Sequence, residues 1–204
     1  MPAPRRQRAA RGGDLVEHLM VLRVQLGERD AYTGLFERYN GRLLYYLRRL
    51  VEPASEAEDV LQEVWLTVIR KVPSLERPEA FKAWIYRIAH NRALSKMRRK
   101  RRDLPLEELP QETEPETSAD TEDDTGSFAV YDAAALHRGL ERLSLAHREA
   151  LTLRFIEELS YGEIAEVQGR TIGTVRSRIH YAKKALHEVL AREARNEDQE
   201  RGRP

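Results

Sequence analysis

The chain has 204 residues, enough for one medium-sized domain or two small ones. It contains no cysteine, which excludes disulfide bonds, thiolate metal sites and cysteine nucleophiles. Basic and acidic residues nearly balance, with 35 Lys and Arg against 34 Asp and Glu. The six histidines form no short-spaced pair beside a carboxylate, so we expect no zinc site and no other cofactor.

The hydropathy pattern argues against a membrane protein. No apolar run approaches the roughly 18 residues that a membrane-spanning helix needs. The basic start, MPAPRRQRAARGG, has no apolar stretch of the signal-peptide type behind it. We therefore expect a soluble, cytoplasmic protein. Because no strand-like alternation is sustained, we expect an all-α fold of two small helical domains around a linker.

The overall charge balance conceals two neighbouring segments of opposite sign. Seven basic residues lie between Arg92 and Arg102, whereas Asp103 to Asp132 holds eleven acidic residues and no Lys or Arg. The acidic segment also contains three prolines and few apolar residues, so it cannot bury enough surface to offset the entropy of ordering. This pattern predicts a flexible acidic linker over 103–132, with separate roles for the segments on either side.

The first part of the chain predicts two helices. We expect residues 1 to about 13 to be disordered and Asp14 to cap a helix. The apolar stripe of that helix is predicted to consist of Leu15, Leu19, Leu22 and Leu26. Asp30 is predicted to cap a second helix, which ends before Pro53 because the residue preceding a proline avoids helical geometry.

A third helix is predicted from a Ser55–Glu58 capping box to Pro73. Asp59, Gln62 and Glu63 lie away from its apolar stripe, and such an acidic and amide patch can bind a basic partner helix. The same pattern is typical of a solvated helix start favoured by the helix dipole. Spacing alone favours this second interpretation.

A fourth helix is predicted from about Ala80, reading FKAWIYRIAHNRALSKMRRKRR. Aromatic residues interleaved with Arg and Lys suit single-stranded DNA, because rings stack on bases while cations follow the backbone. The run from Arg98 to Arg102 can bind phosphates without reading sequence. The alternatives are a core position for Trp84, which we prefer, and a solubilising role for the basic end.

The last third predicts a helix-turn-helix from Tyr161 to His180. Ser160 and Glu163 form a capping box, Gly169 suits the helix end, and Thr171 can cap the next helix. The buried stripe of that helix is predicted to be Ile172, Val175, Ile179, Ala182, Leu186 and Val189. Its outward face is polar and basic, as a helix entering the major groove requires. An ordinary amphipathic helix with a solvated basic face is the alternative.

The segment SYGEIAEVQGRTIGTVRSRIHYAKKAL resembles region 4 of extracytoplasmic-function (ECF) sigma factors, above all in EIAE and GTVRSR. The preceding LERLSLAHREALTLRFIEEL is also similar, although the family often has a proline where this chain has Leu145-Ala146. The resemblance implies binding to the minus-thirty-five element and to the flap of the polymerase β subunit. By motif position it implies DNA contacts from Arg154, Arg176, Ser177, His180 and Tyr181, and the predicted outward face of the last helix adds Thr174 and Arg178.

The N-terminal half carries the matching resemblance. AEDVLQEVW is similar to region 2.2, which docks on the coiled coil of the polymerase β′ subunit and implies contacts from Asp59, Val60, Leu61, Gln62, Glu63 and Trp65. AFKAWIYRIAHNRALSKMRRKRR resembles regions 2.3 and 2.4, which read and melt the minus-ten element. The implied DNA contacts are Arg87, Asn91, Arg92, Ser95, Arg98 and Arg99, and the loop 75–79 corresponds to the one that captures a flipped base.

Composition and the resemblance together predict five segments: a partly disordered N-terminal extension (1–26), region 2 (27–102), the acidic linker (103–132), region 4 (133–192) and a disordered tail (193–204). The resemblance implies a non-enzymatic sigma factor that binds core RNA polymerase, directs promoter-specific initiation of a stress or envelope-response regulon, and is held by an anti-sigma factor. Two alternatives are a dimeric operator-binding regulator and a metal nuclease. A nuclease needs converging carboxylates, yet the acids here lie mainly in the proline-containing linker.

Overall fold

The computed structural model describes residues 5–102 and 132–201, and in these residues it contains helices and no β-strand. The chain divides into two compact units, Met1–Glu107 and Glu108–Pro204. The predicted all-helical class with two domains is confirmed. The acidic linker predicted over 103–132 lies outside the described residues, apart from Asp132. No helix in the described ranges is long and apolar enough to span a membrane.

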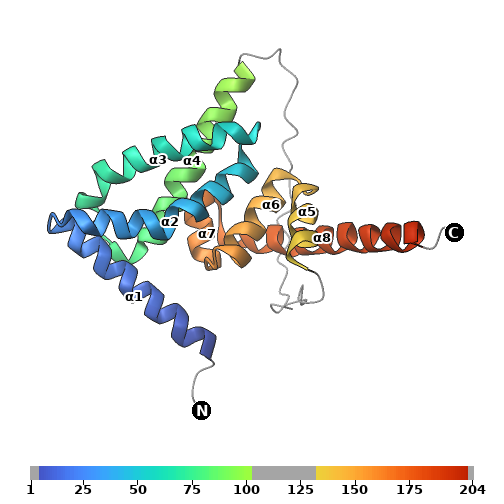
Figure 1. Cartoon of the computed structure of the whole chain (residues 1–204), viewed down its shortest axis with the longest axis horizontal. Helices are drawn as coiled ribbons and strands as arrows, with labels where there is room; N and C mark the ends of the chain where they lie inside the picture. Colours follow the sequence, from blue (N-terminus) through green and yellow to red (C-terminus); the bar gives the residue numbers. More distant parts are fainter. Residues whose placement is uncertain (1–4, 103–131, 202–204) are drawn as a thin grey trace. The chain divides into compact units, whose positions relative to one another are not determined.

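Among its described residues, the first unit contains four α-helices, and short 3₁₀ turns connect the second helix to the third and the third to the fourth (Figure 1). The helices are α1 (Arg5–Gln25), α2 (Arg29–Leu50), α3 (Ala57–Lys71) and α4 (Phe81–Arg102). The 3₁₀ turns are Ala54–Glu56, Val72–Ser74 and Pro78–Ala80. The last two leave a loop of three residues, Leu75 to Arg77, between α3 and α4.

An aromatic cluster forms the centre of this unit. Tyr39, Tyr46, Phe81 and Tyr86 are all fully buried. The ring of Tyr39 meets those of Phe81 and Tyr86 edge-on at 5.5 and 6.5 Å, and Tyr46 meets Tyr86 at 5.3 Å. Edge-to-face pairs at such distances add to the energy of burying the rings. They fix α2 against α4 and so determine which faces of α4 remain outside.

Helix α1 packs by a face other than the predicted one. Leu15, Leu19, Leu22 and Leu26 are between 38% and 78% exposed, whereas Glu17, Val21 and Val24 are buried. The Tyr39 hydroxyl donates to the Glu17 carboxylate, and Arg38 Nε lies 3.7 Å from Glu17 Oε2. The leucine-stripe prediction was wrong because these partners in α2 make burial of the acidic face favourable.

Three predicted helix starts in this unit also differ from the structure. Helix α1 begins at Arg5, nine residues before the expected cap at Asp14, in a stretch rich in the good helix formers Arg, Gln and Ala. Helix α2 follows Glu28, and Asp30 lies inside its first turn. The Ser55 capping box is absent because residues 54–56 form a 3₁₀ turn and Glu58 Oε1 pairs with Arg48 Nη2 at 2.9 Å.

The second unit contains α5 (Ala133–Glu141), α6 (Leu145–Leu151), a π-helical turn (Thr152–Ile156), α7 (Tyr161–Gln168) and α8 (Ile172–Arg201). Asp132 and Ser144 cap α5 and α6 with their side-chain oxygens. The buried line of α8 is Val175, Ile179, Ala182, Leu186 and Leu190. Ile172, predicted to be buried, is 51% exposed because it stands in the first turn, ahead of this line.

Helix α8 also extends further than expected, since the tail was predicted to be disordered from residue 193. The sequence from Ala191 to Arg201, AREARNEDQER, is rich in strong helix formers and contains no glycine or proline. The first glycine after it is Gly202. Helix propensity therefore extends α8 beyond Leu190, the last buried residue among its described side chains.

A close approach between α5 and α8 depends on Gly139. A Cβ atom at this position would lie 2.8 Å from Leu186 Cδ1 and 3.0 Å from Leu190 Cδ2. Both leucines are buried, so neither can turn out of the way without leaving the core. A larger residue here must separate α5 from α8.

We expect Gly139→Val to destabilise the second unit by about 1–3 kcal/mol, because it overpacks this contact. Gly41→Val in α2, where nothing lies within 4 Å of the added Cβ, should change stability by less than about 0.5 kcal/mol. Both tryptophans, Trp65 and Trp84, lie in the first unit. In urea unfolding of Gly139→Val, the midpoint measured by circular dichroism should therefore move to lower urea, while the midpoint measured by tryptophan fluorescence stays unchanged. An unchanged dichroism midpoint would contradict the role of Gly139.

Candidate functional site

The outward face of α3 combines acidic, amide and apolar side chains. Asp59, Gln62 and Glu63 are exposed, as predicted from their spacing. Leu66 and Ile69 share this face by helical spacing and are 60% and 52% exposed. The predicted contacts Val60 and Leu61 are instead buried within the unit, where they pack α3 onto its neighbours.

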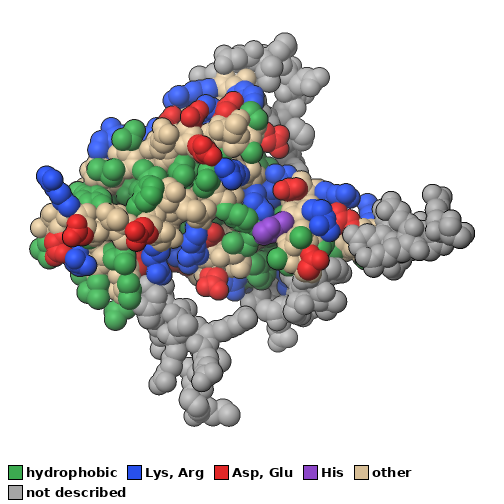
Figure 2. All heavy atoms as spheres, in the orientation of Figure 1, with side chains coloured by type: hydrophobic (Ala, Val, Ile, Leu, Met, Phe, Trp, Pro, Cys, Tyr) green, Lys and Arg blue, Asp and Glu red, His purple; other side chains and the backbone are tan. Residues whose placement is uncertain are grey.

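The apolar part of this face continues onto α2. Phe36 is exposed in α2, and its ring lies 5.1 Å from that of Trp65. Trp65 is half-buried, and its indole Nε1 donates to Asn40 Oδ1 at 3.1 Å. Figure 2 shows hydrophobic side chains gathered over α2 and α3. Leu66 and Ile69 were missed by the sequence analysis, although α3 carries more apolar residues than one buried stripe can hold.

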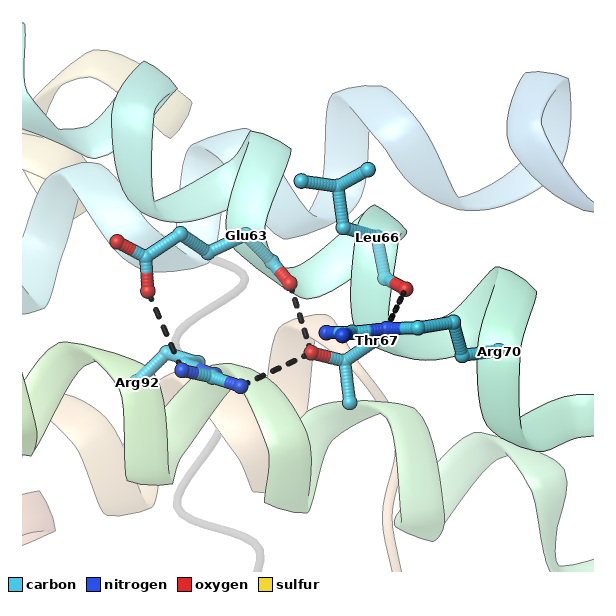
Figure 3. Close-up of polar contacts among 5 residues, drawn as sticks. All are labelled: Glu63, Leu66, Thr67, Arg70 and Arg92. Atoms are coloured by element: carbon cyan, nitrogen blue, oxygen red, sulfur yellow. Dashed lines mark hydrogen bonds and ion pairs between the residues drawn. The ribbon is translucent and has the colours of Figure 1, made fainter.

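A polar contact joins α3 to α4 at the edge of this face (Figure 3). Arg92 Nη1 lies 3.4 Å from Glu63 Oε2, and Arg92 Nη2 donates to Thr67 Oγ1 at 3.1 Å. The Thr67 hydroxyl donates in turn to the Glu63 carbonyl at 2.8 Å. Arg92, predicted as a DNA contact, therefore faces α3 in this structure. Its guanidinium links the two helices that carry the candidate surfaces.

The exposed face of α4 carries the other predicted contacts of this helix. Asn91, Ser95, Arg98 and Arg99 line one open hollow together with Leu94. Arg87 is exposed one turn before Asn91. The structure thus brings four predicted residues together at one place, and the polar amide and hydroxyl lie beside two guanidinium groups.

Two lysines of the basic run, Lys96 and Lys100, have partners within the fold. Lys96 Nζ lies 3.3 Å from Glu56 Oε2, and Lys100 Nζ donates to the Glu52 carbonyl at 2.7 Å. They attach α4 to the connection between α2 and α3. Trp84 is half-buried, with its ring 5.8 Å from that of Phe81. Arg98 and Arg99 therefore lie beside the hollow, whereas Lys96 and Lys100 hold the helix.

In the second unit the predicted helix-turn-helix signals are present. Ser160 Oγ accepts from the Glu163 amide at 3.3 Å, and Glu163 Oε2 accepts from the Ser160 amide at 2.8 Å, so the capping box that starts α7 is confirmed. Gly169 ends α7 with φ +62°, in the left-handed region that suits glycine. Thr171 Oγ1 accepts from the Thr174 amide at 3.2 Å and caps α8.

The predicted contact residues of this unit fall into two groups. Arg176 and His180 are exposed, and Thr174 and Tyr181 are half-exposed. The other three, Arg154, Arg178 and Ser177, form hydrogen bonds within the unit. Arg154 Nη1 donates to the Leu159 carbonyl at 3.2 Å. Arg178 Nη1 donates to Gln168 Oε1 at 3.1 Å. Ser177 was predicted to face outward but is 2% exposed, with its hydroxyl turned back onto the Thr174 carbonyl at 3.0 Å.

The support behind Arg178 reaches further into the unit. Gln168 Nε2 donates to Glu149 Oε2 at 2.9 Å, and both side chains are buried. This chain joins α6, α7 and α8 and fixes the turn between the last two. Within the part of the chain that the structure describes, no group of three or more His, Asp or Glu side chains is arranged to hold a metal ion.

Comparison with known proteins gives the same division into two regions. The family model for Sigma-70 region 2 matches residues 35–103, and that for Sigma-70 region 4 matches residues 133–186. The chain is 34% identical over 184 residues to the RNA polymerase sigma-H factor of Pseudomonas aeruginosa, covering 84% of this chain and 92% of that protein. It is 32% identical to the ECF RNA polymerase sigma-E factor of Escherichia coli K12, covering 84% and 93%.

Solved structures agree with these relatives. A co-crystal structure of the sigma factor RpoE in complex with the anti-sigma factor NepR from Bartonella quintana is 26% identical, with a TM-score of 0.60 over 78% of this chain and 96% of that one. A structure of CnrH in complex with the cytosolic domain of CnrY shares the fold at 22% identity, with a TM-score of 0.58. From the two matched regions and the extent of the identity, the chain belongs to the ECF family of RNA polymerase sigma factors, which direct promoter-specific transcription initiation.

Proposed function

We propose that this chain binds core polymerase through the outward face of α3, reads and opens the minus-ten element with α4, and reads the minus-thirty-five element with α8. The observation that carries the proposal is the presence of two chemically different surfaces on neighbouring helices of the first unit. A mixed acidic and apolar face on α3 lies beside a polar and basic hollow on α4, and Arg92 joins the two helices. In this proposal the chain makes and breaks no covalent bond and works in the cytoplasm.

The α3 face suits a basic partner helix with an apolar centre. Leu66 and Ile69 supply apolar area, while Asp59, Gln62 and Glu63 surround it with acceptors and charge. Protein interfaces are commonly built in this way, with an apolar centre that carries most of the energy and a polar rim that selects the partner. The β′ coiled coil is the proposed partner of this face.

The α4 hollow suits unpaired DNA. Asn91 can hydrogen-bond a base edge, and Arg98 and Arg99 can neutralise the backbone beside it. A base flipped out of the duplex must be held elsewhere, because extrusion costs a few kcal/mol. We assign that task to the loop 75–79, which precedes the N-terminus of α4, whereas the hollow lies in the C-terminal half of that helix.

The second unit suits duplex DNA. The N-terminal turns of α8 present Thr174, Arg176 and His180, and helices of this kind place such side chains against base edges and phosphates in the major groove. Arg154 and Arg178 are proposed to hold this geometry through their hydrogen bonds, and Tyr181 lies beside His180 with ring centroids 5.4 Å apart. The same unit is the proposed partner of the β flap.

We also propose control by an anti-sigma factor. The RpoE structure of similar fold was solved with the anti-sigma factor NepR. An inhibitor that covered the apolar face of α2 and α3 would remove this surface from polymerase. The exposed Phe36 and Leu66 give such an inhibitor an apolar area to bind.

The first test concerns the α3 face. Leu66→Asp should weaken binding to core polymerase by ~30-fold or more, about 2 kcal/mol, because it places a charge at the proposed apolar centre. Leu19→Asp is the control, since Leu19 is a comparably exposed leucine on α1. Binding is measured by titrating labelled protein with core enzyme, and run-off transcription should fall in parallel. Operator binding by the wild-type chain without affinity for core would instead favour the dimeric regulator.

A second test concerns α8. Arg176→Ala should weaken binding of a minus-thirty-five duplex by the holoenzyme and reduce the slope of log affinity against log salt by about 1, because one phosphate contact is lost. Arg192→Ala, an exposed arginine further along the same helix, should leave the slope unchanged. Equal slopes for both variants would contradict the assignment of Arg176.

A third test concerns the contact between the two surfaces of the first unit. A double-mutant cycle with Glu63→Gln and Arg92→Gln should give a coupling energy below about 1 kcal/mol, because both side chains are partly exposed and water screens their attraction. Urea unfolding of the four proteins measures it. A coupling of several kcal/mol would mean that Arg92 is fixed in the fold and cannot serve DNA.

A further inference from the structure

The loop between α3 and α4 is held by a residue that precedes both family matches. Gln25 Nε2 donates to the Leu75 carbonyl at 2.8 Å and lies 3.4 Å from the Val72 carbonyl. These contacts connect positions 50 and 47 residues apart in the chain. The region 2 match begins at residue 35, so Gln25 lies outside it.

The end of α1 fixes the position of Gln25. Val21 and Val24 anchor the helix in the core, and Gln25 lies on the same side, one turn after Val21. The helix then ends in a Schellman-type arrangement, in which the Glu28 amide donates to the Arg23 carbonyl at 3.0 Å and Gly27 has φ +86°. The Gln25 amide is therefore presented from a packed and hydrogen-bonded helix end.

The loop itself has few backbone supports at this point. The Leu75 amide closes the first 3₁₀ turn by donating to the Val72 carbonyl at 3.1 Å, and the next turn begins where the Ala80 amide donates to the Arg77 carbonyl. Between them the chain is extended at Leu75, with φ −72° and ψ 112°. The Leu75 carbonyl lies where the first turn has ended, and the side chain from α1 supplies its donor.

The far end of the loop also faces α1. Arg77 Nε lies 3.3 Å from Glu79 Oε1, with both side chains exposed. The pKa of the Glu79 carboxyl is lowered, first by its own backbone amide and then by Arg77, with a further contribution from the charge of His18 in α1. Helix α1 also packs against both 3₁₀ turns that flank the loop, Val72–Ser74 and Pro78–Ala80.

We infer that Gln25 is a positioning residue for promoter recognition: its amide holds the Leu75 carbonyl and so sets the shape of the loop 75–79 that receives the flipped base. The inference rests on the proposed function of that loop. It gives the end of α1 a part in base selectivity, although Gln25 itself touches no DNA in this arrangement.

The test uses holoenzyme assembled from full-length protein and core polymerase, with a promoter library randomised across the minus-ten element. Gln25→Glu keeps the shape but removes the donor and places a carboxylate beside two carbonyl oxygens. Selectivity at one minus-ten position, measured as the ratio of transcripts from the best and worst base, should fall by about two- to tenfold, the worth of one net hydrogen bond. Affinity for core should stay within about twofold of the wild type.

Matched variants separate positioning from a general loss of structure. Gln25→Lys restores a donor of similar reach and should recover the selectivity, whereas Gln25→Met, uncharged and without a donor, should lose it as Gln25→Glu does. Leu26→Gln adds an amide at the neighbouring exposed position and should behave as the wild type. Amide hydrogen exchange of residues 75–77 should be faster in Gln25→Glu and Gln25→Met and unchanged in Gln25→Lys.

Two outcomes would overturn the inference, and they differ from failure of the proposed function. If the wild type and Asn91→Ala differ in promoter selection while Gln25→Glu matches the wild type, the role of Gln25 is wrong and the proposed function stands. The same holds if Gln25→Lys loses selectivity as completely as Gln25→Glu. If the wild type selects no promoter with core enzyme, the proposed function falls, and the inference falls with it.

Discussion

The first unit depends on one buried tyrosine. Tyr39 lies where three helices meet: its ring contacts Phe81 and Tyr86 of α4, and its hydroxyl donates to Glu17 of α1. A phenol is protonated at neutral pH and can donate, and burial, followed by the Glu17 carboxylate, raises the pKa of Tyr39 further. A buried carboxylate is unfavourable without such a donor, and this requirement determines which face of α1 turns inward. The outward faces of α3 and α4 follow from the same packing.

The second unit is organised by local signals and by one buried polar chain. The Ser160 and Glu163 capping box, the left-handed Gly169 and the Thr171 cap fix the start and end of the two helices in the helix-turn-helix. Glu149, Gln168 and Arg178 then connect three helices through hydrogen bonds. Such a chain sets the angle of the turn more closely than apolar packing alone, because each bond requires a particular direction. The exposed turns of α8 are presented from this support.

Local signals were predictable from the sequence, whereas tertiary partners were not. The helix-turn-helix caps require residues three or four positions apart, and they were identified correctly. The inward face of α1 was missed because four leucines at helical spacing form a stronger pattern than two valines beside an acid, and Tyr39 is distant in sequence. For the same reason the sequence could not separate Arg98 and Arg99 beside the hollow from Lys96 and Lys100, whose partners lie before α3. Leu66 and Ile69 were overlooked because the contacts of α3 were taken from the motif AEDVLQEVW, which ends at Trp65.

The packing of α1 affects how this protein can be divided. A fragment that begins at residue 35, where the region 2 match starts, keeps Tyr39 but loses Glu17, Val21 and Val24. Its surface would then include apolar area that α1 normally covers and a phenol without its acceptor, which favours aggregation. Chimeras that exchange region 2 between relatives should therefore be joined ahead of residue 5, so that the whole of α1 stays with the domain it completes.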